Sequence, residues 1–220
     1  MATRGNVGPN RRPNRRPNRR TRTTRHERRR LSRLAVWAFI AVWSSAVSRA
    51  AADTAPIDAE HSTVTVLVGK SGLFSGFADN HVITASIASG SISEQPPFSI
   101  DVKLRSGDLR VLDPGLSTEK RAEVQARMLG SEVLDAARFP DITFASTTVE
   151  AAGPDRWNVK GRLSIHGQQR DIAFPVARAN GRYRGQVVIR QRDFGIEPIK
   201  VAGGTVKVKD ELTVQFDIAR

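Results

Sequence analysis

The histidines and carboxylates of this chain are the first residues to weigh for chemistry. The sequence holds four histidines and no cysteine, so a metal site would be built from imidazole and carboxylate groups. His61, Asp79 and His81 are the weak candidate set. A metal site needs three or four converging ligands, whereas these three residues lie on two segments. We therefore expect no bound metal, with His61 at the start of a strand and His81 at a rim, both in solvent.

Signals for catalysis are equally weak. A hydrolase needs a nucleophile beside a base, and the sequence has no Gly-x-Ser-x-Gly stretch. His166 precedes Gly167, where we expect an ordinary turn. The sequence therefore predicts a protein that is not an enzyme and has no catalytic residues, and a metal-dependent or enzymatic protein is kept as an alternative.

The positive charge of the chain is concentrated near its beginning. The formal net charge is +13, and residues 1–33 hold thirteen arginines against the single acid Glu27. An apolar run over residues 34–47 follows, and then a small-residue stretch. This order is typical of a secretory signal peptide, and the run is shorter than the roughly 20 residues that span a bilayer. We expect residues 1–52 to be disordered or cleaved, leaving a periplasmic or secreted domain of residues 53–220.

The remaining domain is electrically balanced. Residues 53–220 hold 21 basic and 21 acidic side chains. Three tandem copies of Pro-Asn-Arg-Arg, residues 9–20, fall within the segment that we expect to be removed. Because nucleic-acid binding needs a positive surface, we expect no nucleic-acid partner. The alternative, a polybasic arm for nucleic acid or anionic lipid, requires these repeats to survive maturation.

Alternation of apolar and polar residues dominates the proposed domain. The stretch FSIDVKL places Ile100 and Val102 on one face, and WNVKGRLSI does the same for Trp157, Val159 and Leu163. A period of two residues indicates half-buried strands. We predict eight strands, at residues 61–68, 81–92, 97–105, 141–150, 156–166, 170–178, 182–192 and 205–218.

Two local signals interrupt the strands. Residues 117–130 have helical spacing, with Ser117 or Thr118 as N-cap and Gly130 as the residue after the helix. Asn180-Gly181 favours a type I′ hairpin, because both positions adopt positive φ. With the strands, these signals predict an all-β fold: an extended eight-stranded antiparallel lipocalin-like barrel with a short helical insertion.

The inward faces of such a barrel form a candidate ligand-binding wall. Eight strands leave an interior that side chains fill or that holds one small ligand. Phe74 and Phe77 are flanked by glycines, and are either an apolar lip or a loop that closes the barrel end. The tentative wall residues are Phe74, Phe77, Ile100, Val102, Phe144, Trp157, Val159, Leu163, Phe174, Val187, Ile189, Val214 and Phe216.

Four stretches together resemble the YceI family, in the family's order and over nearly all of residues 57–218. They are IDAEHSTVTVLVGK, ARFPDITFASTTVE, WNVKGRLSIHGQQRDIAFPV and DFGIEPIKVAGGTVKVKDELTVQFDI. The chain is also similar to a branch with a Gly-His-Asp-His-type stretch. In that stretch His81 matches the last histidine, but Ala78 stands where the first would be.

The resemblance implies an exported carrier with a long cavity for a polyisoprenoid or other long apolar lipid. No cofactor is expected beyond a bound isoprenoid quinone or similar lipid. Proximity to a membrane and a homodimer are both compatible with such a carrier. A barrel with a filled core, acting as a stress or interaction protein, is the second alternative.

Overall fold

The computed structural model describes residues 54–71, 81–201 and 206–220. All of them belong to one compact unit, Ser48–Arg220. The proposed signal segment and the candidates Phe74, Phe77 and Asp79 lie outside the described residues. Within the described ranges, no helix combines the length and the apolar character needed to cross a membrane.

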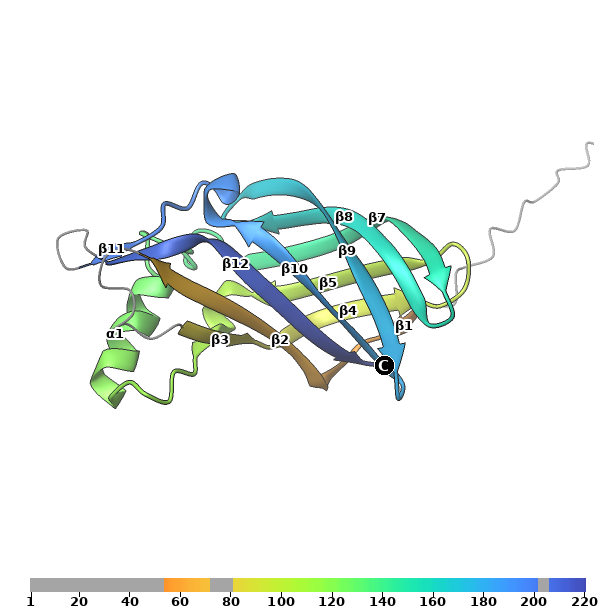
Figure 1. Ribbon diagram of the computed structural model, residues 1–220, viewed down its shortest axis with the longest axis horizontal. Coiled ribbons are helices and arrows are strands. Elements are labelled where there is room, and N and C mark those ends of the chain that lie inside the picture. Colours follow the sequence, from red (N-terminus) through yellow and green to blue (C-terminus); the bar gives the residue numbers. More distant parts are fainter. Residues whose placement is uncertain (1–53, 72–80, 202–205) are drawn as a thin grey trace, which may run out of the picture. The chain divides into compact units, whose positions relative to one another are not determined.

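The described chain is mostly β, a strongly curled antiparallel sheet with one short α-helix (Figure 1). The strands are β1 (Thr54–Pro56), β2 (Asp58–Ser71), β3 (His81–Ala85), β4 (Ile87–Ser93), β5 (Ser99–Arg105), β6 (Arg110–Val111), β7 (Asp141–Gly153), β8 (Arg156–Ile165), β9 (Gln168–Ala179), β10 (Arg182–Arg190), β11 (Lys200–Val201) and β12 (Val206–Ala219). The helix is α1 (Thr118–Leu129), and the 3-10 turns are η2 (Ser106–Asp108) and η3 (Gln191–Phe194). The strand order is β1-β4-β5-β7-β8-β9-β10-β12-β2-β3-β6, with β11 beside β12.

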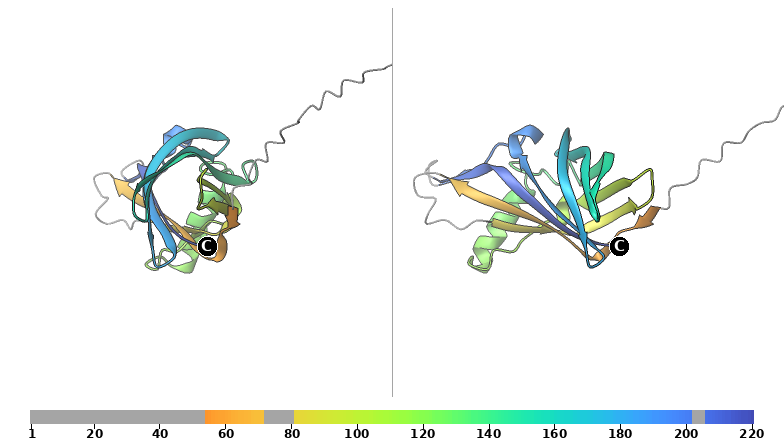
Figure 2. Two further views of the ribbon diagram at one scale, coloured as in Figure 1. Left: turned by 90° about the vertical axis from the view of Figure 1, so that its right-hand side faces the viewer. Right: turned by 45° about the vertical axis from the view of Figure 1, so that its right-hand side comes forward.

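The predicted long strands are present, but the predicted closed cylinder of eight is not what the hydrogen bonds show. The sheet has twelve strands, and β1 and β6 are the two ends of its order. The predicted strand over residues 81–92 is interrupted at Ser86. Its first part, β3, pairs with β2, and its second part, β4, pairs with β5. The continuous segment β3–β4 therefore bonds to strands near both ends of the strand order. As a result the sheet curls round on itself, as the end-on view shows (Figure 2).

Tight hairpins hold β8, β9 and β10 next to one another. Asn180 and Gly181 have φ of 53° and 74°, so the predicted type I′ conformation is confirmed. His166 and Gly167, with φ of 50° and 71°, make an equivalent turn between β8 and β9. These turns set the register that places every second residue of the three strands on the inner face.

Helix α1 begins as the sequence predicts and packs against a sheet edge. The Ser117 side chain accepts a hydrogen bond from the Lys120 amide and is the N-cap. Gly130 follows the last helical residue with φ of −73°, so it does not have the left-handed conformation that commonly ends helices. The side chain of Gln125 accepts from the Val111 amide at 2.8 Å and donates to a carbonyl of the same segment. The helix thereby occupies the hydrogen-bonding edge that β6 would otherwise leave open.

Candidate ligand-binding cavity

The curled sheet encloses a cavity of about 500 Å³. Inward side chains from β2 to β5, β7 to β10, β12 and α1 line it, and nearly all of them are aliphatic or aromatic. This volume lies within the ~300–1,000 Å³ range of small-molecule sites.

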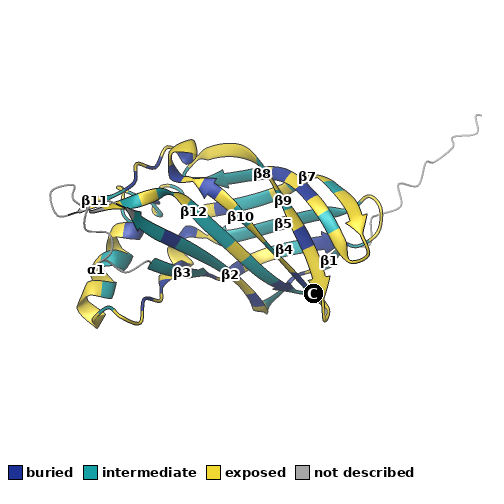
Figure 3. Cartoon of the chain, viewed as in Figure 1, coloured by how far each residue is buried: buried dark blue, intermediate teal, exposed yellow. Residues whose placement is uncertain are grey.

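The structure brings together every tentative wall residue that lies within the described ranges. The cavity is lined by Ile100, Val102, Phe144, Trp157, Val159, Leu163, Phe174, Val187, Ile189, Val214 and Phe216. Nine of them are only half-buried although they point inward, which is why the surrounding strands carry so much of the intermediate colour (Figure 3). Val159 and Ile189 are the two that neighbouring atoms cover almost completely. Whether any of the eleven touches a ligand stays a prediction.

Sequence reasoning missed several parts of the wall. Val64, Val66 and Val68 on β2 line the cavity, and their alternation in the sequence was a sufficient signal. Val124 and Met128 of α1 also line it, and their four-residue spacing places them on one helix face. Tyr183 and Glu94 line it as well. Alternation with Val187 and Ile189 places Tyr183 on the inner face, whereas no sequence pattern identifies Glu94.

A row of three phenylalanine rings crosses the inner wall. Phe174 lies 5.4 Å from Phe144 and 5.4 Å from Phe216, measured between ring centroids. Gly161 and Gly185 make room for this row, because a Cβ at either position would overlap the ring of Phe144 or Phe216, respectively. Along β12, Phe216 comes between Leu212, which pairs with Val68, and Ile218, which pairs with Tyr183. The row therefore lies between the two ends of the cavity, which differ in chemistry.

One end, which we call the Glu94 end, is formed by Glu94, Arg178, Tyr183 and Arg220. Glu94 accepts hydrogen bonds from the Tyr183 hydroxyl and from Arg220, and Arg178 lies 3.9 Å from it. The hydrogen bond from Arg220, then that from Tyr183, lowers the pKa of Glu94. Burial, then the Glu94 carboxylate, raises the pKa of Tyr183 to about 12. Trp157 packs on the tyrosine, with ring centroids 5.8 Å apart.

The other end, which we call the α1 end, contains His81, Asp113 and the cations Lys70, Lys120 and Arg127. The last two line the cavity although their side chains are 67% and 45% exposed. In the described part of the chain, the cavity thus approaches solvent beside α1.

The prediction that His81 is solvated is wrong. Its side chain is only 15% exposed and lines the cavity, and its Nδ1 is hydrogen-bonded to the carboxylate of Asp113, which is 2% exposed. His81 shares the inward parity of Ile83 and Ala85 on β3, so the pleat turns it away from solvent. Asp113 lies in a loop 32 residues later in the chain, and the sequence pattern does not reveal that it contacts His81.

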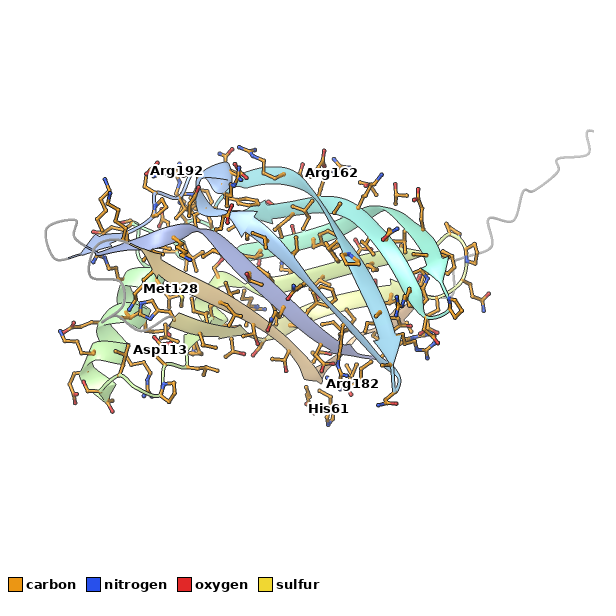
Figure 4. All side chains as sticks on the ribbon, in the orientation of Figure 1. His61, Asp113, Met128, Arg162, Arg182 and Arg192 are labelled. Atoms are coloured by element: carbon orange, nitrogen blue, oxygen red, sulfur yellow. The ribbon has the colours of Figure 1, made fainter. Side chains whose placement is uncertain are left out.

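His61 lies elsewhere and is solvated, as predicted. It is 71% exposed and pairs with Asp58 at 2.8 Å. His81 pairs in register with Val68, seven residues along β2 from His61, or roughly 23 Å at ~3.3 Å per residue. Figure 4 shows His61 beside Arg182, far from Asp113 and Met128 at the α1 end. The two histidines cannot share a metal, and the described residues contain no cluster of three potential metal ligands.

These features, a curled antiparallel sheet, a single helical insertion and an apolar interior, coincide with a known sequence family. The profile of the YceI-like domain matches residues 56–219. The chain belongs to the YceI family. Three Vibrio cholerae strains carry curated relatives, each named a UPF0312 protein, that are 29% identical over 118 residues. That alignment spans 49% of this YceI chain and 58% of the length of those relatives.

Solved structures show the same fold. The crystal structure of BcnA from Burkholderia cenocepacia superposes with a TM-score of 0.51 and 18% identity, over 74% of this chain and 98% of that one. A polyisoprenoid-binding domain from Saccharophagus degradans, implicated in plant cell wall breakdown, gives a TM-score of 0.51 and 17% identity, over 74% and 95%. At this identity the likeness establishes the YceI fold alone. Neither the family description nor these two structure descriptions names a catalytic activity.

Proposed function

We propose that this YceI protein is an exported carrier that holds a polyisoprenoid or other long apolar lipid inside the curled sheet. The observation that carries the proposal is the cavity of about 500 Å³ whose wall is almost wholly apolar. Membership of the YceI family supports it, as does the described ligand class of the Saccharophagus degradans relative.

Burial of a hydrocarbon chain supplies enough free energy without a charged anchor. Transfer from water contributes about 0.8 kcal/mol per CH₂ group, so a chain of about 15 carbons gains roughly 12 kcal/mol before the cost of immobilisation. The half-buried apolar side chains of the wall are the groups that such a chain would cover. Carriage of a water-insoluble lipid outside the cytoplasm also accounts for the signal-like residues 1–52, which we propose direct export.

Organic extraction of the protein purified from its native host tests the proposal directly. We expect mass spectrometry of the extract to show a long-chain lipid in near-stoichiometric amount. An extract without lipid, from protein that also fails to bind an added isoprenoid, would contradict it.

Adjacent valines on β10 provide a matched pair of variants. Val187 lines the cavity, whereas Val188 points outward and is 56% exposed. We expect Val187→Trp to place its ring in the cavity, to leave the melting temperature nearly unchanged and to expel the lipid. Val188→Trp should retain both stability and lipid. If the interior were a filled core, Val187→Trp would instead cost about 1–3 kcal/mol of stability.

A further inference from the structure

We propose that His81 is the head-group subsite of this cavity and accepts a hydrogen bond from the hydroxyl of a long-chain alcohol. The inference rests on the proposed function and names the class of lipid that the same cavity takes. Its basis is the buried pair of His81 and Asp113 at the α1 end.

Asp113 determines which nitrogen of His81 carries the proton. One carboxylate oxygen, Oδ1, accepts from the Val82 amide at 2.7 Å, and Oδ2 contacts His81 Nδ1. An ionised carboxylate only accepts hydrogen bonds, so Nδ1 of a neutral His81 carries the hydrogen. Nε2 then has a lone pair and acts as an acceptor.

Asp113 is itself held firmly. The Leu112 amide donates to the Val82 carbonyl at 2.8 Å, which continues the pairing of β6 with β3 up to the aspartate. Arg121 of α1 donates to the Asp113 carbonyl through Nε at 3.2 Å and to the Leu116 carbonyl through a terminal nitrogen at 3.1 Å. The helical insertion therefore fixes the loop that orients the imidazole, and Asp113 acts as a positioning residue.

Nε2 of His81 is free for a ligand in the described part of the chain, where no hydrogen bond engages it. Other polar groups of the wall serve different roles. The Gln191 side chain donates to the Lys209 carbonyl, and Glu94 is bound at the far end of the cavity. Lys120 and Arg127 bind Glu123 and Glu132 at 2.9 and 2.7 Å.

Lys70 is a further polar side chain of the wall at the α1 end. It lies on β2 two residues past Val68, the register partner of His81. An ammonium only donates hydrogen bonds, so it would favour an anionic head group. The acceptor at His81 instead favours a head group that donates a hydrogen, and an alcohol is the simplest such group on an apolar chain.

The test compares two probes that differ in one hydrogen-bond donor, geranylgeraniol and its methyl ether. Equilibrium binding of both to the full chain should show the alcohol bound roughly tenfold more tightly, the factor for one lost hydrogen bond. His81→Phe should reduce alcohol affinity to that of the ether and leave ether affinity unchanged. His61→Phe, at an exposed histidine outside the wall, should preserve the tenfold preference.

Asp113→Asn tests the proton position itself. The amide oxygen must still accept from the Val82 amide, so its NH₂ group faces His81 Nδ1 and donates to it. The proton of His81 then moves to Nε2, which becomes a donor. We expect this variant to lose the preference for the alcohol while it still binds the ether, whereas a merely structural role would weaken both probes equally.

Specific outcomes would overturn the proposal. Equal affinity of the wild-type protein for both probes would refute the subsite and leave the apolar carrier function standing. The wild-type protein could instead prefer geranylgeranyl phosphate to the alcohol. If Lys70→Gln removed that preference and His81→Phe did not, the head group would be assigned to Lys70 and not to His81. Failure of the wild-type protein to bind any of the three would refute the proposed function together with the subsite.

Discussion

At the Glu94 end of the cavity, polar side chains bind one another, whereas at the α1 end His81 lines the cavity and is bonded only through Nδ1 in the described chain. Glu94 engages both Tyr183 and Arg220, with Arg178 close by. The bonds of Asp113, in contrast, orient a histidine and leave its second nitrogen without a partner in the described chain.

The two ends thus give one apolar cavity a chemical direction. A polar group whose hydrogen bonds are satisfied within the protein closes a surface, since a ligand that displaced its partners would leave a buried charge unpaired. A polar group that is oriented but not satisfied attracts a ligand atom of complementary chemistry. The apolar chain of a lipid would accordingly extend toward the Glu94 end, with its head group at the α1 end.

Disruption of the phenylalanine row between the two ends should have the largest effect. A methyl group at position 185 would overlap the Phe216 ring and lie 2.5 Å from the Pro175 carbonyl oxygen, which cannot move without distorting the sheet. We expect Gly185→Ala to lower the free energy of unfolding by about 1–3 kcal/mol, measured by chemical denaturation. Gly107→Ala is the control, since nothing lies within 4 Å of its Cβ position. Equal stability of the two variants would contradict this account of the row.

Removal of the Glu94 charge should have a smaller but well-resolved effect. Tyr183 is the only tyrosine in the sequence, so the absorbance of tyrosinate reports on it alone. In the wild-type protein we expect this titration near its raised pKa of about 12. Glu94→Gln should move the midpoint part of the way toward 10, since burial also contributes, and should cost about 1 kcal/mol of stability. An unchanged midpoint would show that Glu94 does not act on the tyrosine.

Acid should weaken the Glu94 end by a lesser amount. Because the folded protein lowers the pKa of Glu94 below the ordinary 4.5, this carboxylate stabilises the fold above about pH 4.5. That contribution is lost as the pH falls through the folded-state pKa. The slope of unfolding free energy against pH below 4.5 should be smaller in Glu94→Gln than in the wild-type protein, and identical slopes would assign the acid sensitivity to other carboxylates.

The strands and the apolar wall could be predicted from the sequence because both depend on a local period. Alternation along WNVKGRLSI fixes which residues share a face, whatever the strand pairs with. The same period cannot show that the chain changes partners at Ser86, because β3 and β4 keep apolar residues inward on both sides of it. For this reason the alternation predicts a curled antiparallel sheet but does not predict the order of its strands, in which β1 and β6 are the two ends.

The polar groups of both ends could not be predicted, because they combine residues that are distant in the sequence. Glu94 and Tyr183 are 89 residues apart, and His81 and Asp113 are 32 apart. Each pair is brought together only by the order of strands in the sheet and by the packing of α1. The sequence predicts a solvated His81 because it does not show that Asp113, just after β6, lies buried beside the imidazole.

The smallest effects should come from the cations of the α1 end. Lys120 and Arg127 form exposed ion pairs, and such pairs contribute about 0–1 kcal/mol. We expect Arg127→Gln to change the unfolding free energy by less than about 0.5 kcal/mol. It should also leave the affinity for geranylgeraniol unchanged, because a neutral ligand has no charge for the guanidinium to attract.

For the same reason, the affinity for geranylgeraniol should be nearly constant between low salt and about 1 M salt, where the screening length falls to about 3 Å. A steep loss of affinity with salt, reduced in Arg127→Gln, would instead show that these cations recognise an anionic head group and that the α1 end is selective for charge.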